Sequence, residues 1–294
     1  MSLAHVVRSS PGSPEYPKAV LARTLAISRG SFYLESKIDK KDKALAVEIE
    51  RYHQEVDDTL GHKKLAILLK TGKNRVLRVM KKYGITPRRR SSKYYYAGKT
   101  ADTAPNRLRE QNQGKEEVAF GSILFSDIFE FTLKDGTKIR GCFALLKETR
   151  QVLSLVFDYR MKAELVTSTI THIDTQVLTD LITDTVVFHT DQGTQYGAEM
   201  TIDKILSSGF LRSMSRAGTP TDNPYAERFV GIFKHAVVRK KRYTTLHEFT
   251  QVAQRWITFY NDDRPHEGLK MQSPNTYAEK NGYRRVPIIT KLTV

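Results

Sequence analysis

The segment from residue 118 to residue 160 constrains the fold most, because it has the pattern of three consecutive strands joined by short turns. VAFGSILFSDIFEFTL is strand-like, KDGT supplies a hairpin turn, and two further apolar segments follow. Beyond them the pattern alternates: a helix over 162–182, a strand over 185–190, a short helix over 199–208, a strand over 210–215 and a helix over 223–241. The sequence therefore predicts an α/β domain with a mixed five-stranded sheet and flanking helices.

An acidic residue lies on the apolar face of the first of these strands. Asp127 alternates with large apolar residues, namely Ile123, Phe125, Phe129 and Phe131. A lone buried carboxylate is costly, so it needs hydrogen-bond donors, a cation or a metal; an edge position or a capped carboxylate is the alternative. Asp191 ends the fourth strand. If strands one and four are adjacent and parallel, both acids approach the carboxyl edge of the sheet, where such folds place ligands.

A third acid lies in the last helix of this domain, which Asn223 and Pro224 open as N-cap and first helical residue. Glu227 shares one helix face with Gly231 and Lys234, which suits the close approach of a phosphate backbone; a solvated face is the alternative. Three carboxylates without His or Cys partners favour Mg²⁺ or Mn²⁺. Two such ions, about 3.5–4 Å apart, can hold a phosphodiester between nucleophile and leaving oxygen.

The N-terminal part reads as helices with a concentrated positive charge. Residues 61–99 hold thirteen Lys or Arg and no Asp or Glu, in a chain of net charge +16. Helices are predicted over 43–57, 63–70 and, capped by Asn74, 75–84, whose apolar stripe is Val76, Leu77, Met80 and Tyr83. This helix, turn and basic helix predict a helix-turn-helix DNA-binding unit rather than a solvated basic face. The expected DNA contacts are Lys73, Asn74, Arg75, Arg78, Lys82, Arg88, Arg89 and Arg90.

Composition excludes several other classes. The single cysteine, Cys142, rules out a disulfide framework within one chain. No apolar stretch reaches the roughly 18 residues of a membrane span, and the N-terminus lacks the apolar core of a signal peptide. We divide the chain into an N-terminal segment with a short helix-turn-helix-like element (1–42), a helix-turn-helix domain (43–90), a basic linker (91–115), a catalytic core (116–242), and a C-terminal helix and tail (243–294).

Several motifs occur together in a characteristic order. They are FSDI (125–128), HTDQGTQY (189–196), SRAGTPTDNPYAERF (215–229) and FYNDDRPHEGLKMQSPNTY (259–277), with 35 residues between Asp191 and Glu227. With these motifs the chain resembles the OrfB-type transposases of bacterial insertion sequences in the IS-three family. That family belongs to the retroviral-integrase superfamily, and the resemblance covers nearly the whole chain. It implies an RNase H-like core with a D,D(35)E triad.

Carried over to this sequence, the resemblance gives Asp127, Asp191 and Glu227 as catalytic, metal-binding acids and Lys234 as a DNA contact. It gives the pair Asp222 and Asn223 a loop-ordering role, and His189, Gln192 and Gly193 shaping roles. The chain departs from the family pattern at three positions, Phe125, Ala236 and His62, none of which is one of the expected ligands.

The resemblance also implies a reaction and partners. Water frees a 3′-hydroxyl at the element's ends with Mg²⁺ or Mn²⁺, and that hydroxyl then attacks target DNA. The implied partners are double-stranded DNA of the terminal repeats and the target, a second protomer at least, and an upstream OrfA product or fusion. The implied location is the bacterial cytoplasm, at the nucleoid.

Three other functions compete with this interpretation. A retroviral-type integrase would need an N-terminal His/Cys zinc module, which one cysteine and scattered histidines cannot build. A catalytically silent or domesticated transposase would act as a DNA-binding regulator, and a simple RNase H-type nuclease would not need the basic helices. The amphipathic segment 246–260 is either a contact between protomers or a helix packed on its own core.

Overall fold

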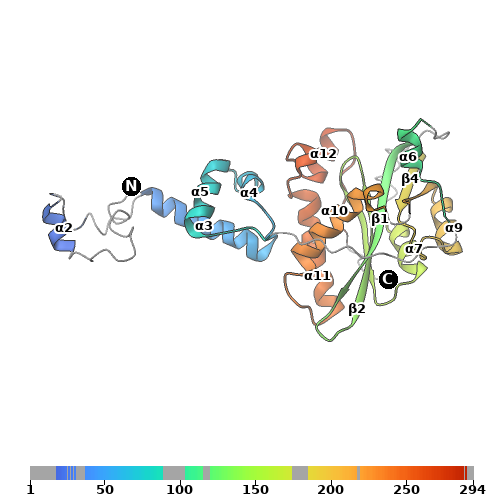
Figure 1. The fold of residues 1–294 in the computed structure, drawn as a ribbon, viewed down its shortest axis with the longest axis horizontal. Helices are drawn as coiled ribbons and strands as arrows, with labels where there is room; N and C mark the ends of the chain where they lie inside the picture. The colour runs from blue at the N-terminus through green and yellow to red at the C-terminus, as the bar shows by residue number, and fades with distance from the viewer. Residues whose placement is uncertain are drawn as a thin grey trace.

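The structure is a computed structural model that describes residues 18–24, 26, 28, 30, 37–88, 103–114, 120–173, 185–216, 219–287 and 289. It contains a helical N-terminal region and a larger α/β region (Figure 1). Arg89, Arg90, the second short helix expected within 18–35 and the end of the helix expected over 162–182 lie outside the described residues.

The α/β region is built on one mixed five-stranded sheet, as predicted. Its strands are β1 (Phe120–Thr132), β2 (Lys138–Leu146), β3 (Val152–Asp158), β4 (Thr185–Thr190) and β5 (Phe210–Met214). They lie in the order β3-β2-β1-β4-β5. β1, β2 and β3 pair antiparallel, whereas β4 pairs parallel with both β1 and β5. An antiparallel meander extended by two parallel strands is the RNase H-like arrangement that the resemblance implies.

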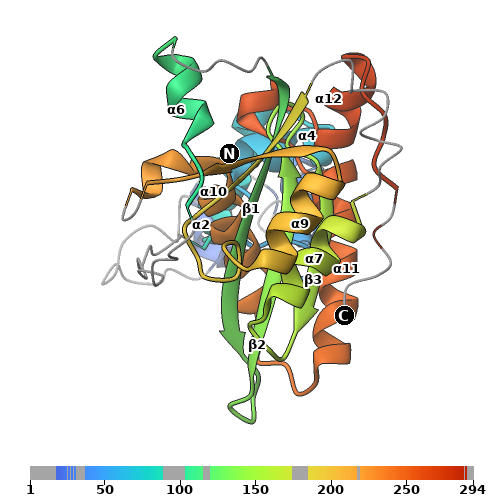
Figure 2. The same ribbon diagram turned by 90° about the vertical axis from the view of Figure 1, so that its right-hand side faces the viewer.

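Helices cover both faces of this sheet (Figures 1 and 2). On one face, α10 (Pro224–Phe233) and α11 (Leu246–Asp262) pack against the phenylalanines of β1. On the other, α7 (Ala163–Thr171) and α9 (Glu199–Ser207) pack against Leu124, Cys142 and their neighbours. The alternation of β1 thus separates two cores, and Asp127 belongs to the face covered by α10.

The helix predicted over 223–241 is not uniform. Pro224 occupies its first turn, as expected, but the α-helical part ends at Phe233. Residues Lys234–Val238 then form a π-helical turn, η3. A π turn inserts one extra residue, which leaves no mark on hydrophobic spacing over one turn, so the sequence did not reveal it.

The helical region consists of α3 (Lys37–Glu55), α4 (His62–Leu68) and α5 (Lys73–Tyr83), preceded by α2 (Lys18–Thr24). α3 begins before residue 43, so the boundary predicted between residues 42 and 43 falls within one continuous helix. The prediction that Asn74 caps α5 is wrong: Gly72 is the N-cap, and no side chain caps this helix. Val76 and Met80 are buried as predicted, but Val79 takes a core position in place of Tyr83, which ends the helix 39% exposed.

Smaller elements complete the chain. α6 (Arg107–Asn112) lies within the predicted linker and is capped by the Asn106 side chain. α12 (Pro274–Lys280) is capped by Ser273, and short 3₁₀ turns occur at η2 (Pro220–Asp222) and η4 (Glu267–Leu269).

The apolar stripe of α11 lies inside its own core, where Phe249, Ala253, Trp256 and Tyr260 are buried, so the intramolecular interpretation of segment 246–260 is correct. Among the described helices, none is both long and apolar enough to cross a membrane.

Candidate active site

Asp127 and Asp191 come together where β1 and β4 pair. The two strands are adjacent and parallel, and Phe125 pairs with His189 in their register. Asp127 follows Phe125 by two residues, and Asp191 follows His189 by two residues. Both acids therefore lie at the carboxyl edge of the sheet, where β4 ends. This is the meeting that the sequence predicts for these two acids.

The electrostatics of this edge disfavour two negative charges. Burial and the charge of Asp191 raise the pKa of Asp127 to about 8, against weaker lowering by the backbone N–H of Ile128 and by Lys234. Burial also raises the pKa of Asp191, and the backbone N–H of Gly193 opposes it. Two carboxylates with raised pKa values at one position make a site where a bound cation would be strongly favoured.

The turn after β4 holds the Asp191 carboxylate in place. The backbone N–H of Gly193 donates to Asp191 Oδ1 at 3.0 Å. A Cβ at position 193 would lie 3.1 Å from that same oxygen, which is tighter than ordinary contact. Glycine therefore allows the backbone to approach the carboxylate, which gives this residue of the HTDQG segment the shaping role that the resemblance implies.

Helix α10 brings Glu227 and Lys234 to the same edge. The Asn223 side chain does not cap the helix; its amide donates instead to the carbonyl oxygen of Ser126 at 3.2 Å, which fixes the helix start beside β1. Glu227 is exposed, and desolvation raises its pKa. Lys234 Nζ lies 5.7 Å from the ring centre of Phe129, and its pKa is lowered by burial although Asp127 acts in the opposite direction.

The donor set fits a hard divalent cation, although the three acids do not form a closed cage. Within the described ranges, no three His, Cys, Asp or Glu side chains lie close enough together to hold a metal ion. Glu227 is exposed whereas Asp127 and Asp191 are half-buried, so it is the outermost of the three acids. Carboxylate oxygens are the ligands that Mg²⁺ and Mn²⁺ prefer, and Asp127 and Asp191 are already adjacent, so drawing in Glu227 would complete the set.

The buried side chain of His189, two residues before Asp191, stabilises the same edge of the sheet. The two ring nitrogens of His189 lie 2.8 Å from Ser213 Oγ and 3.0 Å from Ser215 Oγ. Burial lowers the pKa of His189 to about 4, with Asp222 opposing, so the ring is neutral at pH 7. His189 therefore joins β4 to β5 rather than donating or accepting protons.

Asp222 orders the loop before α10, in agreement with the role that the resemblance implies. Its carboxylate forms an ion pair with Arg216 at 2.9 Å and accepts from the Asn106 amide at 2.9 Å. The bonds from Arg216 lower the pKa of Asp222, so it remains ionised and engaged.

The basic face of α5 is largely engaged within the chain. Arg78 Nη2 lies 2.7 Å from the carboxylate of Asp42, whose side chain is only 1% exposed, and Lys82 pairs with Asp39 at 2.6 Å. Arg75 donates to the carbonyl oxygen of Lys41. Only contacts across 34 to 43 residues reveal this packing, so the helical pattern of α5 did not predict it.

The other expected DNA contacts differ in their surroundings. Lys73 and Asn74 are exposed at the start of α5. Arg88 is half-buried and binds Asp58 and two backbone carbonyl oxygens of the α/β region. The DNA-contact set stays a prediction, with Lys73 and Asn74 as its most accessible described members.

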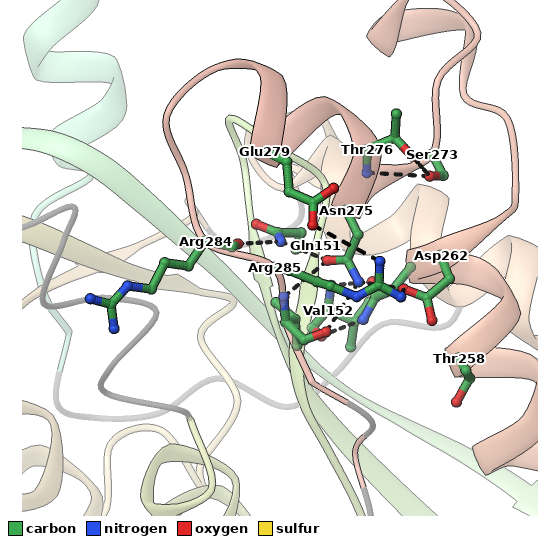
Figure 3. Close-up of polar contacts among 12 residues, drawn as sticks. Gln151, Val152, Thr258, Asp262, Ser273, Asn275, Thr276, Glu279, Arg284 and Arg285 are labelled. Atoms are coloured by element: carbon green, nitrogen blue, oxygen red, sulfur yellow. Dashed lines mark hydrogen bonds and ion pairs between the residues drawn. The ribbon is translucent and has the colours of Figure 1, made fainter.

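The C-terminal motif 259–277 forms a network of hydrogen bonds that joins α11, α12 and the start of β3 (Figure 3). The Asn261 amide makes a two-way pair with the backbone of Val152, at 3.0 Å in each direction. The Gln151 amide donates to Asn275 Oδ1 at 2.8 Å, and Asn275 donates to Asp262 at 2.6 Å. These hydrogen bonds fix the helical layer behind α10 to the sheet.

Comparisons with known proteins agree with this architecture. The Integrase core domain family matches residues 209–274, which include β5, α10 and the whole of α11. The transposase for insertion sequence element IS904 of Lactococcus lactis is 35% identical over 96 residues, covering 32% of this chain and 38% of that protein. The putative transposase InsK for element IS150 of Escherichia coli K12 is 25% identical over 281 residues, covering 92% of this chain and 96% of that protein.

The chain is similar to insertion-sequence transposases, and its match to the Integrase core domain family covers residues 209–274. The segment that is 35% identical to the IS904 protein spans 38% of the length of that protein. Among solved structures, the catalytic domain of the Mos1 mariner transposase aligns with a TM-score of 0.41 and 12% identity, over 51% of this chain and 76% of that one. A likeness of that size does not establish a common fold, so the fold assignment rests on the strand order.

Proposed function

We propose that this chain is a DNA transposase that cleaves the ends of an insertion sequence and joins the freed 3′-hydroxyl to target DNA. The observation that carries the proposal is the pair of acids at the parallel β1–β4 edge, where burial and mutual repulsion raise the pKa of Asp127 to about 8. Glu227, on the helix that Asn223 anchors beside β1, is the third acid of the proposed triad.

The acids would hold Mg²⁺ or Mn²⁺, with two ions per site as the finer proposal. Bound there, such ions supply Lewis acidity to a phosphodiester and activate the attacking hydroxyl. The residues of the chain then have separate tasks. Asp127 and Asp191 provide oxygen ligands from the rigid sheet, the Gly193 N–H orients Asp191, and Lys234 binds a phosphate beside them.

The open face of α10 is suited to a DNA backbone. A Cβ at Gly231 would meet no atom within 4 Å, so the fold leaves space beside the helix face that carries Glu227 and Lys234. Glycine inside a helix weakens it, and among the described residues no close contact explains that cost. A phosphate backbone running along this face would pass both residues.

The active assembly is proposed to contain at least two protomers. Each chain supplies one triad, whereas transposition engages two element ends, and one site cannot hold two distant scissile phosphates. Light scattering of the complex with paired end DNA measures the number of protomers directly. A fully active complex with one protomer for two ends would refute this part of the proposal. An upstream OrfA product, added or fused, is a further proposed partner.

The deciding experiment incubates the protein with Mg²⁺ and DNA carrying the native element ends, then sequences the products. Cuts at the 3′ ends of the element, followed by joined strands, are the expected result. Binding of the ends without any cleavage in Mg²⁺ or Mn²⁺ would instead identify a DNA-binding regulator. Cleavage without regard to the end sequence would identify a simple nuclease.

A further inference from the structure

Arg88 connects the helical region to the helix that carries the candidate site. Within the helical region, its backbone N–H donates to the carbonyl oxygen of Asp58 at 2.9 Å, and its guanidinium pairs with the Asp58 carboxylate at 2.9 Å. Across the junction, the same guanidinium donates to the carbonyl oxygens of His235 at 2.7 Å and Arg239 at 3.0 Å. One side chain thus joins segments 147 and 151 residues apart in sequence.

The two accepting carbonyl groups belong to the π-helical turn η3 and its end. His235 lies within the turn, and Arg239 is its C-cap. Carbonyl oxygens at a helix C-terminus favour a cation, because they carry the negative end of the helix dipole. A π turn is rare and occurs where contacts with its surroundings stabilise it. The hydrogen bonds from Arg88 are such contacts at the C-terminal end of η3.

Lys234 is the first residue of that turn. Its ammonium group lies over Phe129, two residues along β1 from Asp127, and its charge acts on the Asp127 carboxylate. The backbone N–H of Lys234 bonds to the carbonyl oxygen of Val230 in α10, whereas its own carbonyl oxygen accepts from the Arg239 N–H at 2.8 Å. Arg239, whose carbonyl oxygen accepts from Arg88, therefore links Lys234 at the acidic edge to the Arg88 guanidinium.

The anchor of Arg88 is itself fixed. Asp57, next to Asp58, forms a buried ion pair with Arg264 at 3.0 Å, with side chains 0% and 1% exposed. Phe259 of α11 packs against the cores of both the helical and the α/β regions. The segment of the helical region that binds Arg88 is therefore itself fixed to the α/β region.

We infer that Arg88 is a positioning residue that holds η3, and with it Lys234, at the active-site edge. It thereby couples the expected DNA-binding helices to the chemistry. The inference about chemistry rests on the proposed transposase function, whereas the contact between Arg88 and η3 does not.

Hydrogen–deuterium exchange of the full-length protein without DNA tests the contact alone. Arg88→Ala should speed exchange of the η3 amides, including the Arg239 N–H that donates to the Lys234 carbonyl oxygen, by about tenfold, while β1 is unchanged. Arg88→Lys should lie between Arg88→Ala and wild type. Arg51→Ala, at an exposed pair on α3, is the matched control and should change nothing in η3. Unchanged exchange in η3 for Arg88→Ala would overturn the inference.

Cleavage kinetics at saturating end DNA test the coupling. Arg88→Ala should lower the rate at saturating DNA about tenfold, beyond any effect that it has on DNA affinity, and Arg88→Lys should restore part of the rate. In a Lys234→Met background, Arg88→Ala should add little further loss, because both changes disturb the same group. Additive losses, or a loss of affinity that accounts for the whole effect, would reject the positioning role. If wild-type protein cuts no DNA, the proposed function fails, and the exchange experiment still decides whether Arg88 holds η3.

Discussion

Asp127 in β1 and Asp191, which directly follows β4, each lie two residues past the Phe125–His189 pair of these neighbouring parallel strands. The side chains of the pair are also in contact, with ring centres 5.5 Å apart. The two acids are thus set by paired strands inside the sheet, whereas Glu227 lies exposed on a helix. Chemistry that requires fixed ligands would depend most on the two strand residues.

Replacing any acid of the proposed triad should abolish DNA cleavage and strand transfer. Asp127→Asn, Asp191→Asn and Glu227→Gln each remove a charged ligand while keeping the size of the side chain. Binding of end DNA, measured by fluorescence anisotropy, should remain, because the expected contacts lie mainly in the helical region. Glu199→Gln, at an exposed acid of α9, is the control and should cleave normally. Full cleavage by any one of the three variants would remove that residue from the triad.

Divalent ions should stabilise the protein through the same acids. Mg²⁺ at about 100 times its dissociation constant should add roughly 2.7 kcal/mol to the free energy of unfolding. Asp127→Asn should lose most of this gain, which thermal unfolding with and without chelator measures. Ca²⁺ should support DNA binding but little cleavage, because its looser coordination positions the reacting oxygens poorly. Cleavage that persists undiminished in excess chelator would contradict a metal mechanism.

Substitutions at Gly231 should separate folding from DNA cleavage. Gly231→Ala should raise the free energy of unfolding by about 0.5–1 kcal/mol, because alanine is the better helix residue and its Cβ meets no atom within 4 Å. Gly231→Phe should fold but lower cleavage of end DNA by at least about tenfold, since the ring would fill the space proposed for the phosphate backbone. Gly231→Ala is the matched control for this loss. Wild-type cleavage by Gly231→Phe would show that DNA does not pass this face.

Lys73 and Arg78 should respond differently to alanine substitution. Lys73→Ala should weaken DNA binding and flatten the log–log salt dependence by about 0.9 if one phosphate contact is lost. Arg78→Ala should mainly lower the melting temperature, because it leaves the Asp42 carboxylate, 1% exposed, with only Lys82 as a nearby charged partner. Anisotropy titrations over a range of salt, with Arg51→Ala as control, measure the slopes. An equal flattening by both variants at unchanged melting temperature would place Arg78 on the DNA.

The mixed five-stranded sheet could be predicted from local patterns, and the meeting of Asp127 with Asp191 followed on the condition that their strands are adjacent and parallel. Alternation along β1 fixed which residues share a face, but the strand order that makes β1 and β4 neighbours depends on contacts between distant segments. The caps of α6 and α12 also have sequence signals, because Asn106 and the Ser273–Pro274 pair precede these helices. The two segments are too short for their periodicity to predict a helix.

The features that were missed depend on contacts between distant segments. The pairing of Arg78 with Asp42 joins residues 36 apart, and a basic stripe looks the same whether it faces DNA or another helix. The side chain of Asn223 binds Ser126 rather than its own helix, although its N-cap position was read correctly. The role of Arg88 at η3 required both the π turn and the junction between regions, neither of which has a sequence signature.

The buried pair of Asp57 and Arg264 should make stability depend on pH in the acid range. Burial alone would raise the pKa of Asp57, but Arg264 and two hydrogen bonds from Thr59 outweigh it and lower the pKa below 3.8. Because the pKa is lower in the folded chain, the pair stabilises the protein above about pH 4 and loses this effect as the pH falls through the folded value. Arg264→Met should cost about 3–5 kcal/mol at pH 7, since it leaves a buried unpaired charge.

Urea unfolding at pH 7 and pH 3 checks this dependence, with the Asp57→Asn and Arg264→Met double variant as the control. The double variant should be more stable than Arg264→Met alone at pH 7, because its asparagine carries no charge and still accepts from Thr59. The difference in free energy of unfolding between wild type and Arg264→Met should become smaller towards pH 3, where Asp57 of the variant is neutral. A difference of the same size at both pH values would mean that packing of the Arg264 side chain, rather than its charge, holds the two regions together.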